Sequence, residues 1–192
     1  MLRKLAIVLA VLIVVFLVSV AIQPDEYRIS RSASIAAPPD AVFAQTNDLH
    51  KWAAWSAWDK IDPAMVRTYE GAASGVGAVY KWSGNDEIGE GKMTITESKP
   101  NELVRVKLEF FKPMEGQAMA DMTFKPDGAG TTATWEMYGC NNFLGKAFHL
   151  CIDMDKMIGG KYEESLAALK SLVESGAKPA DAAKPTAAST AK

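Results

Sequence analysis

The fold is decided by residues 102–139, which read ELVRVKLEFFKPMEGQAMADMTFKPDGAGTTATWEMYG. Apolar and polar side chains alternate through residues 102–110, 117–124 and 131–139, which is the period of a strand with one buried face. Residues 126–130, Pro-Asp-Gly-Ala-Gly, are typical of a tight turn. The stretch therefore predicts three antiparallel strands, the last two joined by a hairpin.

The same alternation continues toward the N-terminus. Short runs of period two occupy residues 66–70, 78–83 and 89–97, and another lies at 27–35. Between that first run and the others, residues 39–44 and 48–52 favour short helices. Parity gives the four best-defined strands one apolar face, formed by Met93 and Ile95; Val104, Val106, Leu108 and Phe110; Ala118, Ala120, Met122 and Phe124; and Ala133, Trp135 and Met137. Such a sheet is covered on one side.

A helix is expected to supply the cover. Apolar side chains recur at helical spacing from residue 143 onward, namely Phe143, Ala147, Cys151, Met154, Ile158, Tyr162, Leu166, Leu169 and Val173. Gly159 and Gly160 interrupt the pattern and predict a kink or a split there. The chain is therefore expected to be an α+β protein.

Non-globular segments flank this body. Residues 5–22 carry no charge and are long enough to cross a bilayer as a helix. Arg3 and Lys4 precede them, so the positive-inside tendency puts residues 1–4 in the cytoplasm and residues after the 23–26 linker outside it, in the periplasm of a diderm bacterium. The alternative is a cleaved signal peptide ending near Ser19-Val20-Ala21. The Ala-, Lys- and Pro-rich tail, 174–192, is expected to be disordered.

Composition excludes some functions. The formal net charge is −2 at pH 7, and the sequence has no basic stripe of the kind that nucleic-acid binding requires. Cys140 and Cys151 are too few for a disulfide scaffold in a chain that can bury an ordinary core. Both are therefore expected to be buried thiols.

The order of these elements and four motifs resemble the SRPBCC superfamily (START, Bet v 1-like), in particular its bacterial polyketide cyclase/dehydrase-like branch. The resembling motifs are residues 35–43 (IAAPPDAVF), 52–58 (WAAWSAW), 84–93 (GNDEIGEGKM) and 141–146 (NNFLGK). The resemblance covers about residues 27–173. It implies a helix-grip fold, in which about seven antiparallel strands wrap around a long C-terminal helix. It also implies a cavity between sheet and helix that takes lipids, sterols, hormones or polyketides, and most such proteins bind while some catalyse.

Few residues suggest catalysis. His50 and His149 are the only histidines, and both are expected to be solvated surface residues because neither falls on an apolar stripe. No metal-ligand spacing and no glycine-rich phosphate loop occurs, so no cofactor is expected. The sequence leaves enzymatic activity uncertain and leans against it.

The tryptophans and methionines each leave more than one interpretation open. Trp52, Trp55 and Trp58 recur every three residues and either line a cavity mouth, dip into a lipid headgroup layer, or plug the end of the core. The inward-facing methionines suit either an adaptable pocket or a plain core.

The function expected from these observations is that of a membrane-anchored protein binding a hydrophobic small molecule or lipid. The rivals are a polyketide cyclase- or aromatase-like enzyme and a ligand-free tethered interaction or stress-related module. Neither the ligand nor a protein partner follows from the sequence. The residues expected to line the cavity are Trp55, Trp58, Trp82, Met93, Val106, Leu108, Met122, Trp135, Met137, Phe148, Met154 and Ile158.

Overall fold

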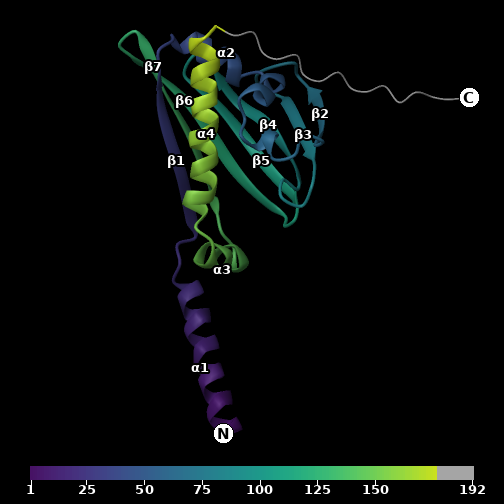
Figure 1. Cartoon of the computed structure of the whole chain (residues 1–192), viewed down its shortest axis with the longest axis vertical. Coiled ribbons are helices and arrows are strands. Elements are labelled where there is room, and N and C mark those ends of the chain that lie inside the picture. Colours follow the sequence, from purple (N-terminus) through teal and green to yellow (C-terminus); the bar gives the residue numbers. More distant parts are fainter. Residues whose placement is uncertain (177–192) are drawn as a thin grey trace, which may run out of the picture.

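The alternating runs form one seven-stranded antiparallel sheet in the computed structural model, which describes residues 1–176 apart from the side chain of Cys151 (Figure 1). The spatial order is β1-β7-β6-β5-β4-β3-β2, so six strands follow one another as a meander and the first strand joins the last. The strands are β1 (Glu26–Ile35), β2 (Val66–Gly71), β3 (Ala78–Ser83), β4 (Glu90–Lys99), β5 (Leu103–Lys112), β6 (Gly116–Asp127) and β7 (Gly130–Cys140). The predicted α+β class and meander are confirmed.

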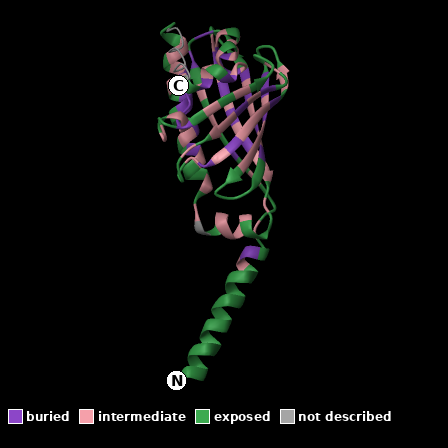
Figure 2. Ribbon diagram, turned by 90° about the vertical axis from the view of Figure 1, so that its right-hand side faces the viewer, coloured by how far each residue is buried: buried purple, intermediate pink, exposed green. Residues whose placement is uncertain are grey.

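The predicted parity holds across the sheet. Met93 lies opposite Leu108, Ile95 opposite Val106, and Met122 between Val104 and Trp135, so the apolar side chains share one face. Buried and less buried residues alternate along the strands (Figure 2). We call this apolar side the inner face.

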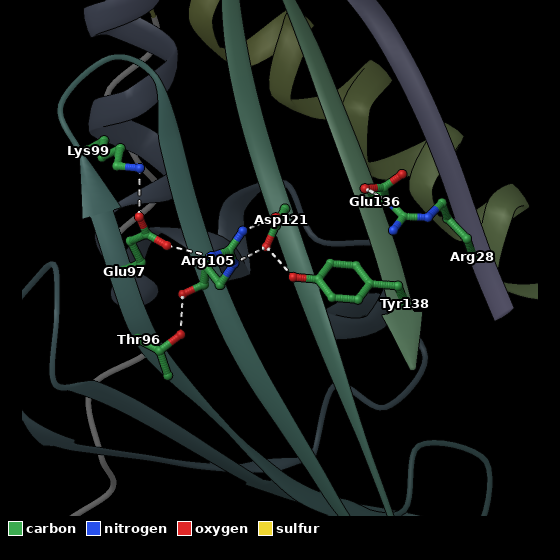
Figure 3. Close-up of polar contacts among 8 residues, drawn as sticks. All are labelled: Arg28, Thr96, Glu97, Lys99, Arg105, Asp121, Glu136 and Tyr138. Carbon is green, nitrogen blue, oxygen red and sulfur yellow. Dashed lines mark hydrogen bonds and ion pairs between the residues drawn. The ribbon is translucent and has the colours of Figure 1, made fainter. Parts of the chain in front are cut away.

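Polar side chains cover the outer face in pairs of opposite charge (Figure 3). Arg105 donates to both oxygens of Asp121, at 2.8 and 2.7 Å, and to Glu97 at 2.5 Å. Lys99 pairs with Glu97, and Arg28 with Glu136. Exposed pairs of this kind add little to stability, and their charges balance, so the outer face behaves as a solvated surface.

Helices close the inner face. Between β1 and β2 lie α2 (Pro39–Thr46) and two 3₁₀ turns, η1 (Leu49–Ala54) and η2 (Trp58–Lys60). After β7 come α3 (Phe143–Cys151) and α4 (Met154–Glu174). Helix α4 packs along β1 and buries Tyr162, Leu166 and Leu169.

The predicted break at Gly159-Gly160 is wrong, because the last helical segment divides at Ile152 and Asp153 instead. Ile152 is extended, and the Asp153 side chain accepts a hydrogen bond from the Lys156 amide at 3.0 Å, which caps a new helix. Gly159 continues α4, and a Cβ there would lie 2.2 Å from Nη2 of Arg31. The glycine therefore provides space for a side chain from the sheet.

Arg31 fastens α4 to β1. Its guanidinium donates to Glu163 Oε1 at 2.6 Å and to Asp155 Oδ2 at 2.8 Å, both on α4. This hydrogen bonding holds the pKa of Asp155 below its ordinary value. Two acidic residues of α4 thus position the helix against the sheet.

Helix α3 does not point its apolar residues at the sheet, although the sequence predicts that it does. Its apolar residues Phe143 and Leu144 are 48% and 73% exposed, whereas the Lys146 side chain is only 13% exposed and pairs with Asp25 at 2.5 Å. His149, predicted to be a solvated surface residue, packs against Tyr27 with 5.1 Å between ring centroids. The helix lies under one end of the sheet, so its polar side meets the chain entering β1.

A separate helix, α1 (Leu2–Ala21), precedes the sheet domain and contacts α3 (Figure 1). It has a mean hydropathy of 2.9 and is long and apolar enough to cross a membrane, although a signal sequence has the same properties. The expectation of a buried thiol at Cys140 is wrong, because this last residue of β7 is exposed. The tail predicted as disordered lies, from residue 177, outside the described residues.

Replacing Trp135 tests the core. Trp135→Ala is expected to lower the free energy of unfolding by about 3–5 kcal/mol, because a buried aromatic side chain leaves a cavity. Urea unfolding followed by circular dichroism measures the change. Thr134→Ala, at the neighbouring outward position, is the matched control and is expected to cost about 1 kcal/mol or less. Equal losses would contradict the assignment of the two faces.

Acidification is expected to destabilise the packing of α3. Burial lowers the pKa of His149, so the folded state binds fewer protons than the unfolded state as pH falls below about 6.5. Stability is therefore complete above that pH and declines as the pH falls toward the folded-state pKa. The thermal midpoint measured between pH 7 and pH 5 is expected to fall less in His149→Phe than in the wild type. An identical fall in both proteins would refute the assignment.

Candidate ligand-binding site

The residues predicted to line a cavity fall into two groups. Five are buried in the core: Trp55, Val106, Met122, Trp135 and Met137. Seven are partly buried: Trp58, Trp82, Met93, Leu108, Phe148, Met154 and Ile158. The structure thus separates residues that pack from residues that retain access to solvent.

Aromatic rings fill one half of the space between sheet and helix. Trp135 stacks on Tyr162 of α4 at 4.2 Å between centroids, with an angle of 12° between the rings. Trp52, Trp55 and Trp58 all lie against Trp135 at 5.5–5.6 Å. Trp52 and Trp55 are almost fully buried, so of the alternatives for this triplet the structure supports core packing.

The other half of the inner face is more open. Trp82, Met93, Leu108 and Phe110 occupy neighbouring strands and are each partly exposed, and we call these four side chains the apolar floor. Met93 lies opposite Leu108, and Trp82 meets Phe110 edge-on at 6.0 Å. Helix α4 lies along β1, on the far side of the inner face, and leaves the floor accessible.

Two glycines on the inner face leave space for aromatic rings to lie against the strands. Gly91 lies opposite Trp82, and a Cβ at Gly91 would lie 2.4 Å from the indole ring. Across the sheet, the Tyr27 ring covers Gly139 in the same way. Two aromatic rings therefore lie flat on the strands instead of standing into the space above them.

Two pockets open beside α3. This helix lies at the end of the sheet where β1 begins and β7 ends, which we call the base. The larger pocket has a volume of about 660 Å³, within the usual range for ligand sites. The smaller, about 160 Å³, includes Phe110 of the apolar floor. Both pockets border Tyr27 and Asn141.

The larger pocket is amphiphilic. Its apolar lining comes from Ile29, Leu150, Ile152 and Met154, and of the twelve residues predicted to line a cavity only Met154 borders it. Its polar lining includes Arg28, Lys146 and His149, together with Asp153 and Asp155. A ligand with an apolar body and a polar end matches this lining.

Parity also places a polar group on the inner face, and the sequence analysis missed it. Arg67 of β2 donates to Asp59 Oδ1 at 2.6 Å and to the Met65 carbonyl at 3.1 Å. Tyr80 lies nearby, and burial raises the pKa of its hydroxyl, which stays protonated at neutral pH. Arg67 and Tyr69 share the inward parity of β2, which is the signal that reveals this group.

The residues of this polar group are suited to hydrogen bonding more than to proton transfer. Arg67 and Asp59 neutralise each other, whereas the Tyr80 hydroxyl has no hydrogen-bond partner among the described residues. A buried hydroxyl without a partner is available to a polar atom of a ligand or to water. Within residues 1–176, no cluster of three or more His, Cys, Asp or Glu side chains has a geometry that could hold a metal ion.

Solved structures with this fold come from several sources. A protein from Chromobacterium violaceum aligns with a TM-score of 0.56 at 20% identity, covering 79% of this chain and 99% of its own. A Rhizobium leguminosarum protein aligns at 0.57 and 13% identity, covering 78% and 95%. The di-domain ARO/CYC BexL from the BE-7585A biosynthetic pathway aligns at 0.58 and 16% identity, covering 81% of this chain and 52% of its own.

Sequence comparison gives the family. The comparison with curated proteins finds no match. The family model described as polyketide cyclase/dehydrase and lipid transport matches residues 26–174, which include every strand, α2, both 3₁₀ turns, α3 and α4. The chain belongs to the polyketide cyclase/dehydrase and lipid transport family.

Proposed function

We propose that the chain is a membrane-anchored protein that binds an apolar or amphiphilic small molecule, of the lipid or polyketide kind, at the base of its helix-grip domain. The observation that carries the proposal is the accessible apolar floor, whose Phe110 borders the smaller of the two pockets beside α3. Burial of an apolar ligand surface there supplies affinity at about 25 cal/mol per Å². The family's description, which includes lipid transport, agrees with this class of ligand.

The ligand contacts proposed here are a subset of the residues predicted from sequence. We assign Trp82, Met93 and Leu108 to the floor of the site, and Phe148, Met154 and Ile158, on α3 and α4, to its helical side. Trp55, Trp58, Val106, Met122, Trp135 and Met137 form the wall behind them through core packing. The Tyr80 hydroxyl is the polar group nearest to the apolar floor in strand register, because Tyr80 lies opposite Met93.

The anchor is α1. Its 20 residues extend about 30 Å at 1.5 Å per residue, the thickness of a bilayer's hydrocarbon core. Arg3 and Lys4 favour a cytoplasmic N-terminus and an extracytoplasmic domain. Val20, near the end of α1, is fully buried, and this contact favours a retained helix over a cleaved signal peptide.

A second candidate function is cyclase-like catalysis, favoured by the unpaired Tyr80 hydroxyl beside the Asp59–Arg67 pair. A hydroxyl at this position orients a carbonyl or hydroxyl of a bound chain. Conversion of a bound polyketide by the protein, lost in Tyr80→Phe, distinguishes catalysis from binding. A ligand-free interaction module is the remaining rival, and an empty binding site supports it.

A charge on the apolar floor is expected to abolish ligand retention. Residues 24–176 are purified from cells and analysed by native mass spectrometry and lipid extraction. Met93→Glu is expected to reduce a co-purifying apolar molecule about tenfold or more, because the ligand would bury a carboxylate. Thr94→Glu, next in sequence but on the outer face opposite Lys107, is the matched control and keeps the ligand. An empty wild-type protein that also takes up no fluorescent fatty acid would overturn the binding proposal.

Removal of the Tyr80 hydroxyl is expected to separate ligand binding from stability. Tyr80→Phe weakens a ligand carrying a polar group by about fivefold, or about 1 kcal/mol, the usual worth of one hydrogen bond. The free energy of unfolding stays equal or rises, because the lost hydroxyl has no partner in the protein. Fluorescence titration and urea unfolding measure the two effects. Unchanged affinity would remove Tyr80 from the site.

A further inference from the structure

Helix α3 carries its apolar residues on the wrong side for a helix in water. Phe143, Leu144 and Leu150 are 48%, 73% and 40% exposed, and at 100° per residue they share one side of the helix. His149 lies on the opposite side, against Tyr27, and Lys146, next to Leu150 around the helix, is held down by its ion pair with Asp25. A surface helix of a soluble domain shows the reverse arrangement. The exposed side of α3 therefore requires an apolar medium or partner.

The position of α3 identifies that medium. Helix α3 lies across the end of α1, between α1 and the sheet, in both views of the molecule (Figures 1 and 2). The two helices are in contact, and the surface of α1 is apolar and exposed along nearly its whole length. The exposed side chains of α3 are therefore carried by a helix that adjoins the apolar surface of α1.

We propose that α3 is an interfacial helix, with Phe143, Leu144 and Leu150 immersed at the headgroup–acyl boundary of the leaflet from which α1 emerges. The proposal rests on the membrane anchoring proposed above and adds the orientation of the site. Amphipathic helices that lie in this plane bury their apolar side about 5–10 Å into the leaflet. The charged residues of the larger pocket then lie at headgroup depth.

This orientation gives the ligand a route. Gln23 and Pro24, in the connection between α1 and β1, line the larger pocket together with Leu150 of α3. The mouth of the pocket therefore faces the bilayer, and an amphiphile enters from the leaflet without crossing water. Lys146 and Arg28 line this pocket, and their positive charges would attract the phosphate or carboxylate of an entering lipid.

Depth-dependent fluorescence quenching tests the proposal on the full chain. Cys140→Ser and Cys151→Ala remove the native thiols, and a nitrobenzoxadiazole label is attached to Leu144→Cys or Phe143→Cys after reconstitution into phosphatidylcholine vesicles. Doxyl lipids labelled near the top of the acyl chain are expected to quench both labels. Ala129→Cys, in the β6–β7 turn at the opposite end of the sheet, is the matched control and is expected to stay unquenched.

A label in the middle of α1, at Val11→Cys, measured with doxyl lipids labelled near the end of the acyl chain, separates the two proposals. Quenching at Val11 without quenching at Leu144 and Phe143 would overturn the interfacial helix and leave the anchor intact. Absence of quenching at Val11 would overturn both. Protection of Leu144 from a water-soluble quencher without lipid quenching would mean that a second copy or another protein covers α3, and would also overturn the proposal.

Discussion

The stacking of Trp135 on Tyr162 is the contact on which the arrangement of the domain depends. It joins the centre of β7 to the middle of α4, and Trp52, Trp55 and Trp58 pack around it from the 3₁₀ turns. Rings of this size exclude a ligand from half of the space that a helix-grip fold encloses. Any guest is therefore restricted to the base, where the apolar floor and the pockets beside α3 remain accessible.

Polar contacts at the domain's edge complement this packing. Arg31 binds Asp155 and Glu163 and thereby holds α4 against β1, at the side of the sheet away from the apolar floor. Gly159 makes the approach of the guanidinium possible. The lateral position of α4 leaves Met93 and Leu108 partly exposed at the middle of the inner face, which a centrally placed helix would bury.

The sequence predicted the sheet well because a period of two admits one assignment of inner and outer faces, as Met93, Val106 and Trp135 illustrate. Helical periodicity was less informative. The stripe containing Phe143 shows that α3 is amphipathic, but not which medium its apolar side meets. Gly159 predicted a kink because its tertiary contact with Arg31 leaves no local trace. The site was predicted in part. Parity identified the floor, and the parity of β2 also carries the signal for the inward Arg67, whereas the ring packing at Trp55 and Trp135 required the three-dimensional structure.

The connection between α1 and β1 is only four residues long, from Ile22 to Asp25. Its last residue, Asp25, forms an ion pair with Lys146. Fully extended, the connection would span about 14 Å. With α1 in a bilayer, as proposed, the domain has no means of reaching a distant membrane or retrieving cargo from bulk solution. A ligand present in the same leaflet would therefore reach the domain by lateral diffusion over a short distance.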